Sequence, residues 1–260
     1  MSAVKPLPLL LITPIFILLA HYLAVFPHEY AHATMAWILG FKNNPFNIIY
    51  GGKSVGNIFL LSHVDENVNY KMIYDAGYRD YISMIAFSGP GIGNGLLFIV
   101  SLVLLKNTVV KKHSYFYYFL FWFNLMNLGN FYDYVPIRTF ASSGDVFNFV
   151  FGINISPWWV FIFAGYLVAF LIIRFYQNTL IQVYDTLILS CNMQKFVLVL
   201  ATFILFGFFG GFLYVMLQPD FMQKASTEYL LSVISMVAIP GILCANWPTR
   251  SWVKNALQNQ

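Results

Sequence analysis

The sequence predicts an all-α polytopic membrane protein, a class indicated by its hydropathy, its scarcity of charge and its repeated apolar stretches. Of its 260 residues, 59% are hydrophobic and only 9% are charged, and the mean hydropathy is +0.69. A surface of this composition suits a bilayer rather than water. Because a hydrocarbon core roughly 30 Å thick needs about 20 apolar residues per helix, the chain has the length for several crossings.

Apolar stretches long enough to span a membrane occur about six times along the chain. We expect transmembrane helices at about 7–39, 81–105, 115–132, 157–176, 195–217 and 229–246. The distribution of Lys and Arg between alternate connections slightly favours a cytoplasmic N-terminus. The chain is therefore predicted to be an integral, multi-pass membrane protein.

The connection between the first two expected helices, residues 41–80, contains the densest polar material. Apolar and polar residues alternate between Asn47 and Leu61, and Gly51-Gly52 supplies a turn signal between them. Alternation with a period of two is typical of a strand. We therefore predict a short β-like hairpin after the first helix.

Charge and cysteine usage exclude two other classes of protein. The formal charge of +4 is spread thinly, and no basic run is longer than Lys111-Lys112, so we predict no nucleic-acid partner. Cys191 and Cys244 lie far apart and lack C-x-x-C spacing, which argues against a disulfide framework. The expected environment is the lipid bilayer.

The run H-E-Y-A-H from His28 to His32 lies near the end of the first expected helix. Residues i and i+4 share a helix face, so one tetrahedral zinc ion can bridge both imidazoles. Glu29 projects beside the ion, where it can activate a zinc-bound water and later protonate a leaving amine, as a metalloprotease requires. Chance accounts for on the order of 0.004 such motifs at this composition. We therefore predict Zn²⁺ as cofactor, His28 and His32 as metal ligands, and Glu29 as the catalytic residue.

A third metal ligand has to come from another part of the chain. With alternating helices, the connection after the third expected helix lies on the same side as the end of the first, and it contains Asp133 and Asp145. Asp145 follows a glycine and opens an apolar run, from which a carboxylate can cap a helix and reach inward. Asp133 precedes Pro136 and can instead be a water-facing turn residue. We predict Asp145 as the third ligand, with Asp133 as the alternative and a simple capping role for Asp145 left open.

Three stretches of the chain carry a resemblance to a known family. They are F-P-H-E-Y-A-H-A with Trp37 to Gly40, S-G-P-G-I-G-N at 88–94, and the segment 130–145. Together they resemble the site-2 protease-like family of intramembrane zinc metalloproteases over about the first 150 residues. The third stretch departs from the family's Asp-Gly order, because this chain has Gly144-Asp145. The resemblance implies a zinc-dependent endopeptidase that hydrolyses a peptide bond of a membrane-anchored protein substrate.

On this interpretation 1–260 is a single transmembrane domain, with a catalytic core at about 7–155 and additional helices at about 157–246. A hydrolase of this kind must stabilise developing negative charge, so we predict that Asn94 and Asn130 bind the substrate backbone or the oxyanion. Interhelical hydrogen bonding is the alternative for both. Two other functions also fit the motif: a catalytically silent metal-binding membrane protein, or a small transporter that uses the His/Glu cluster as an ion path.

Overall fold

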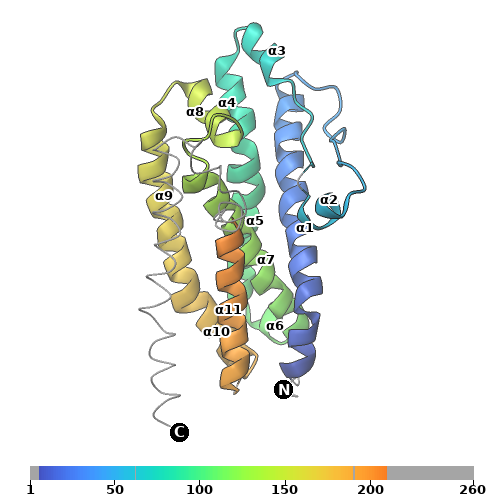
Figure 1. Cartoon of the computed structure of the whole chain (residues 1–260), viewed down its shortest axis with the longest axis vertical. Helices are drawn as coiled ribbons and strands as arrows, with labels where there is room; N and C mark the ends of the chain where they lie inside the picture. The colour runs from blue at the N-terminus through green and yellow to red at the C-terminus, as the bar shows by residue number, and fades with distance from the viewer. Residues whose placement is uncertain (1–5, 62, 190, 210–260) are drawn as a thin grey trace.

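The structure is a computed structural model that describes residues 6–61, 63–189 and 191–209; the regular secondary structure of this part of the chain is helical, without β-strands (Figure 1). The bundle is formed by α1 (Pro6–Ile38), α4 (Arg79–Phe87), α5 (Gly95–Lys106), α7 (Ser114–Tyr132), α9 (Pro157–Arg174), α10 (Leu180–Thr186) and α11 (Asn192–Phe209). The short helices are α2 (Val55–Leu60), α3 (Tyr70–Asp75), α6 (Thr108–Lys111) and α8 (Asp145–Ile153). The segments η1 (Ser88–Asn94), η2 (Asp133–Ile137) and η3 (Phe175–Thr179) follow α4, α7 and α9 directly; η1 and η3 are π-helical, whereas η2 is kinked at Val135.

Three helical stretches of the described residues are long and apolar enough to cross a membrane: Leu11–Ile38, Arg79–Lys106 and Pro157–Thr186. Two of the three combine an α-helix, a π-helical segment and a second α-helix into one continuous rod. These stretches support the membrane-protein class, whereas six crossings stay a prediction. The expected helix at 229–246 and the end of that at 195–217 lie outside the described residues.

Helix α7 occupies the centre of the bundle and contacts both α1 and α5. Its aromatic side chains Tyr117, Phe121 and Trp122 are completely buried. The hydroxyl of Tyr118 lies 2.6 Å from the Thr13 hydroxyl on α1, so this buried polar group also has a partner. A helix buried on most sides serves as a packing core. Helix α7 thus holds α1 and the α4–η1–α5 rod against one another.

The predicted β-like hairpin between Asn47 and Leu61 is wrong. Its second half forms the helix α2, whose first turn is capped by the Ser54 hydroxyl accepting a hydrogen bond from the Asn57 amide. The buried Asn57 side chain donates to the Tyr50 and Gly52 carbonyls, which a hairpin would have satisfied with a partner strand. Alternation of apolar and polar residues carries no information about this helix cap or about the hydrogen bonds of the Asn57 side chain. In the described residues the pairing that remains is one isolated bridge, Ile49 with Asp65.

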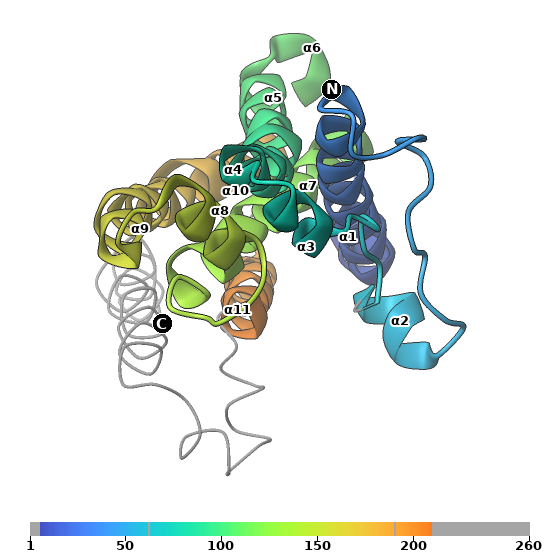
Figure 2. The same ribbon diagram turned by 90° about the horizontal axis from the view of Figure 1, so that it is seen from above.

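Helix α1, the α4–η1–α5 rod, α7, the α9–η3–α10 rod and α11 run in alternating directions along the bundle (Figure 1). The C-terminal halves of α1 and α7 therefore lie toward the same end as α8, as the alternation of expected helices predicts. Figure 2 shows the same bundle along its axis, with α8 beside α4 and with α2 outside the bundle next to α1. The packing of α8 on α4 brings the first residue of α8 over the histidine motif.

Candidate metal centre

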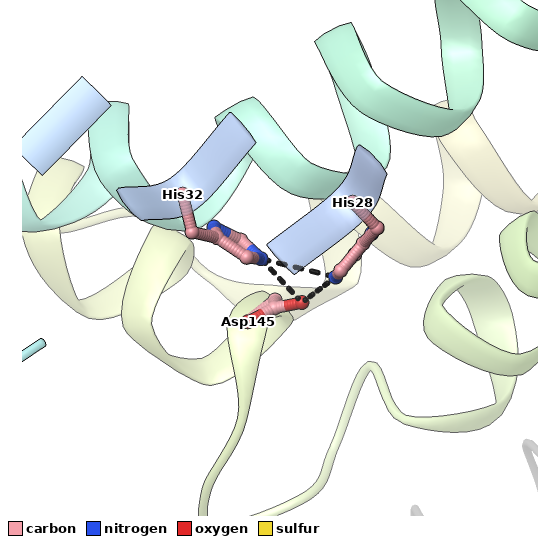
Figure 3. Close-up of side chains that lie close together, drawn as sticks. All are labelled: His28, His32 and Asp145. Carbon is pink, nitrogen blue, oxygen red and sulfur yellow. Dashed lines mark hydrogen bonds and ion pairs between the residues drawn. The ribbon is translucent and has the colours of Figure 1, made fainter. Parts of the chain in front are cut away.

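Three side chains from two helices converge at the end of the bundle where α8 lies (Figure 3). His28 and His32 project from one face of α1, and Asp145 reaches them from the first turn of α8. The Asp145 Oδ2 atom lies 3.1 Å from His28 Nε2 and 3.2 Å from His32 Nε2, and the two Nε2 atoms are 3.0 Å apart. This group could hold a metal ion.

The donor set fits a small tetrahedral cation. Ligand atoms about 2.05 Å from a tetrahedral zinc ion are about 3.3 Å apart, close to the 3.0–3.2 Å separations of this triangle. Both imidazoles are almost fully buried, with 2% and 1% of their surface exposed. Buried lone pairs that point at one another are unfavourable unless a proton or a cation lies between them.

Hydrogen bonds at the other ring nitrogens orient both imidazoles. His32 Nδ1 lies 2.6 Å from the Ile85 carbonyl oxygen, and His28 Nδ1 lies 2.7 Å from Asn94 Oδ1. Both oxygens can only accept, so each Nδ1 carries the proton and donates it. Each Nε2 atom is then left with its lone pair directed toward Asp145. Metal-binding histidines commonly have this second hydrogen bond, which selects the tautomer and the ring orientation.

The amide that orients His28 belongs to a chain of buried hydrogen bonds between three helices. Asn94 Nδ2 donates to the Ala24 carbonyl (2.9 Å) and to Asn127 Oδ1 (3.1 Å), and Asn127 Nδ2 donates to the Phe123 carbonyl (2.8 Å). These contacts require the Asn94 oxygen to face the imidazole. Asn94 is fully buried and makes the interhelical hydrogen bonds that were its alternative role, while its contact with a substrate stays a prediction. Sequence analysis missed Asn127.

Glycine in the S-G-P-G-I-G-N stretch allows η1 to lie directly against the motif. A Cβ atom on Gly89 would be 2.1 Å from His32 Nε2 and 2.7 Å from His28 Cε1. A Cβ atom on Gly93, one turn later, would be 2.9 Å from the His28 Cα atom. Neither separation is possible for a real side chain, so both positions require glycine for the close approach of η1 to α1.

Asp145 is placed by the glycine before it and by the helix that it begins. Gly144 has φ of +95°, a conformation that side-chain-bearing residues rarely adopt. The N-terminus of α8 favours a carboxylate at this position. Burial opposes ionisation of the Asp145 carboxyl, but where the His32 and His28 Nε2 atoms carry protons, their charge and hydrogen bonds outweigh burial and hold its pKa below the usual range. The other candidate, Asp133, instead forms an ion pair with Arg138 at 2.9 Å.

Glu29 points to a different neighbour, the carboxyl group of Glu66. The two groups lie within hydrogen-bonding reach, and each residue is 9% exposed. Glu66 comes from the connection between α2 and α3, which Lys42 fastens by donating from Nζ to the carbonyls of Asn47, Glu66 and Asn67. Sequence analysis assigned no role to Glu66. The acidic pair Asp65-Glu66 in a mostly apolar chain was the one feature that could have drawn attention to it.

An aromatic residue also lies at the centre. The ring of Tyr134, in η2, stacks on that of His28 with centroids 4.9 Å apart, and its hydroxyl is 3.1 Å from His28 Nε2. Sequence analysis assigned no role to Tyr134. Asn130, predicted to bind substrate, is buried in the last turn of α7 just before η2. Its predicted role stays a prediction.

A cavity of about 490 Å³ extends from Asp145 between α4, η1, α8 and α9. Apart from Asp145 it is lined by apolar residues, among them Phe87, Phe149 and Phe163. Apolar peptide side chains or lipid tails suit such a lining, whereas charged solutes do not.

Comparison with protein-family models, characterised proteins and solved structures finds no match to this chain. The resemblance to site-2 protease-like enzymes therefore depends on the motifs quoted above and stays a prediction.

Proposed function

We propose that this chain is a zinc-dependent intramembrane endopeptidase of the site-2 protease-like kind. The observation that carries the proposal is the convergence of His28 Nε2, His32 Nε2 and Asp145 Oδ2 within 3.0–3.2 Å, with both imidazoles oriented by hydrogen bonds at Nδ1. Glu29 follows the first ligand directly in the chain, which is the arrangement that a zinc peptidase uses.

Each residue has a separate task in this proposal. His28, His32 and Asp145 hold Zn²⁺, which when bound polarises the scissile carbonyl and lowers the pKa of water to about 7. Glu29 accepts a proton from the attacking water and delivers it to the leaving amine. The contact between Glu29 and Glu66 supplies a neighbouring carboxyl with which that proton can be shared.

The surroundings favour a substrate that arrives through the membrane. The motif lies within the candidate membrane-spanning stretch Leu11–Ile38, and the apolar cavity reaches Asp145. A peptide segment rich in apolar side chains can occupy such a cavity without leaving charged groups unpaired. The proposed substrate is therefore a membrane-anchored protein.

Metal analysis of the purified full-length protein tests the first half of the proposal. Wild type is expected to contain about one zinc per chain, and His28→Ala and Asp145→Ala are expected to lose it, because three ligands are needed for tight binding. Asp133→Ala is the matched control, since Asp133 pairs with Arg138. Retention of zinc by Asp145→Ala together with its loss from Asp133→Ala would assign the third ligand to Asp133.

Proteolysis in liposomes tests the second half. A library of single-pass membrane segments is incubated with wild type or Glu29→Gln, and the products are identified by mass spectrometry. We expect cleavage by wild type alone, with zinc present in both proteins. Zinc without any Glu29-dependent product would favour a catalytically silent metal-binding protein, and zinc or proton flux into the liposomes would favour a transporter.

A further inference from the structure

We propose that Tyr134 is a further catalytic residue, whose hydroxyl donates a hydrogen bond to the scissile carbonyl oxygen as negative charge develops on it. The inference rests on the proposed peptidase function and assigns the donor that such a reaction needs. A hydrolase of amides gains much of its rate from hydrogen-bond donors aimed at this oxygen.

The hydroxyl of Tyr134 lies directly beside one of the proposed ligand atoms. It lies 3.1 Å from His28 Nε2, the same separation at which Asp145 Oδ2 lies from that nitrogen. A substrate oxygen drawn to an ion held by His28 would arrive on the side of the site where this hydroxyl lies. A carbonyl oxygen polarised by the ion is such an atom.

The hydrogen bonds of His28 determine which acceptor the Tyr134 hydroxyl proton can reach. His28 Nδ1 donates to Asn94, so Nε2 has a single lone pair and accepts. That lone pair cannot serve an ion and the Tyr134 hydroxyl together. With an ion on Nε2, the phenol proton is available to another oxygen acceptor.

The fold holds the Tyr134 ring in place from two directions. Its ring is stacked on His28 with an interplanar angle of 10°, and the Arg138 guanidinium lies 5.5 Å from its centroid. Arg138 is itself paired with Asp133 at 2.9 Å. Helical geometry ends at the next residue, Val135, which has φ of −135° and ψ of 117°. A donor held in this way loses little freedom when it meets the substrate.

The test compares Tyr134→Phe with wild type in two measurements on the full-length protein in detergent. Zinc content reports the ligands, and acetohydroxamate binding to the Co²⁺-loaded protein, followed by visible absorption, reports the donor. Acetohydroxamate coordinates through oxygen and presents an anionic oxygen where the carbonyl oxygen would lie. We expect unchanged zinc content and about tenfold weaker acetohydroxamate binding, the loss of one hydrogen bond. Cleavage is expected to fall roughly 100-fold.

Tyr118→Phe is the matched control, because it removes the hydroxyl of a tyrosine on α7, the helix that leads into η2. Its hydroxyl contacts Thr13 rather than the histidines, so acetohydroxamate affinity is expected to be that of wild type. Normal metal content with unchanged acetohydroxamate affinity in Tyr134→Phe would overturn the Tyr134 assignment alone. Loss of zinc from Tyr134→Phe would also overturn it, since Tyr134 would then be a ligand. Absence of metal from wild type would instead refute the proposed function.

Discussion

The two sides of α1 at the H-E-Y-A-H run pack against different parts of the structure. The histidine side faces packed helices: η1 and the end of α4 orient the imidazoles, and Gly89 lets η1 lie against them. The Glu29 side faces the connection 41–69, from which Glu66 approaches. Part of that connection is exposed, and Phe46 and Val55 are more than 70% exposed.

Under the proposed function, this difference would separate metal binding from proton transfer. Metal affinity depends on ligand atoms held to a few tenths of an ångström, and buried helix contacts with satisfied hydrogen bonds supply that precision. A proton-transfer group tolerates small movements, so a loop can supply its neighbour. Variants of the helical side should therefore change metal affinity, and variants of the loop should change turnover or loop order while leaving the metal bound.

Gly89→Ala is expected to have the largest effect. The added methyl group would be 2.1 Å from His32 Nε2, so η1 or the imidazole has to move away from the ligand triangle. We expect zinc affinity to fall by at least about 100-fold, because a displaced first ligand costs more than the 10–100-fold typical of an outer partner. Competition with a fluorescent zinc chelator measures this.

The control for this variant is Gly95→Ala in the same rod. A Cβ atom there would lie 3.4 Å from the edge of the Phe131 ring, an ordinary contact. We expect wild-type zinc affinity. Equal losses in both variants would indicate general misfolding of the rod and would contradict a specific requirement at Gly89.

Asn94→Ala is expected to weaken zinc binding by 10–100-fold, the usual cost of removing an outer partner of a metal-bound histidine. The variant removes the acceptor of the His28 Nδ1 proton, so the ring can rotate or change tautomer. Asn94→Asp retains the acceptor for His28 but loses the donor to Ala24 and Asn127, so it should recover only part of the affinity. Asn124→Ala, which removes a buried amide that contacts Ser101, is the control for lost helix packing. Unchanged affinity in Asn94→Ala would show that packing alone orients His28.

Sequence analysis could predict the features that depend on local spacing. One helical turn between His28 and His32 brings both imidazoles to one face, and the structure has them there. The alternation of helix direction limited the carboxylate to the connection after the third helix, and Asp145 is the one beside both imidazoles. These inferences needed only helix periodicity and topology.

The remaining features depend on contacts that no local pattern records. The hydroxyl of Tyr134 meets an imidazole 106 residues away, and Asn127 reaches Asn94 across 33 residues. Neither contact has a sequence signature, because the sequence does not distinguish Asn127 or Tyr134 from the other polar residues of α7 and η2. The hairpin prediction failed for the opposite reason. The alternation was real, but Ser54 and Asn57 stabilise a helical turn there instead of a strand.

Glu66→Ala is expected to leave the zinc content unchanged and to lower cleavage about tenfold. It removes the carboxyl that contacts Glu29, so Glu29 loses the neighbour that orients it and shares its proton. Glu66→Gln, which can still hydrogen-bond to Glu29, should retain more activity than Glu66→Ala. Asp65→Ala removes the adjacent acidic group, whose carboxylate accepts from the Asn67 amide, and is the control. Loss of zinc in Glu66→Ala would mean that the loop also holds the metal ligands.

Asn57→Ala is expected to have the smallest effect on the centre and a clear effect on the loop. The Asn57 side chain donates to the Tyr50 and Gly52 carbonyls and accepts from the His63 amide, and it is 5% exposed. At about 1 kcal/mol for each hydrogen bond, the free energy of local opening should fall by roughly 2–3 kcal/mol. Hydrogen exchange of the amides in 50–63 should then accelerate by about 30–150-fold, while α1 exchanges as before and zinc stays bound. Faster exchange that spread into α1 around His28 would show that loop and ligands open as one unit, and the division between the two sides of the helix would not hold.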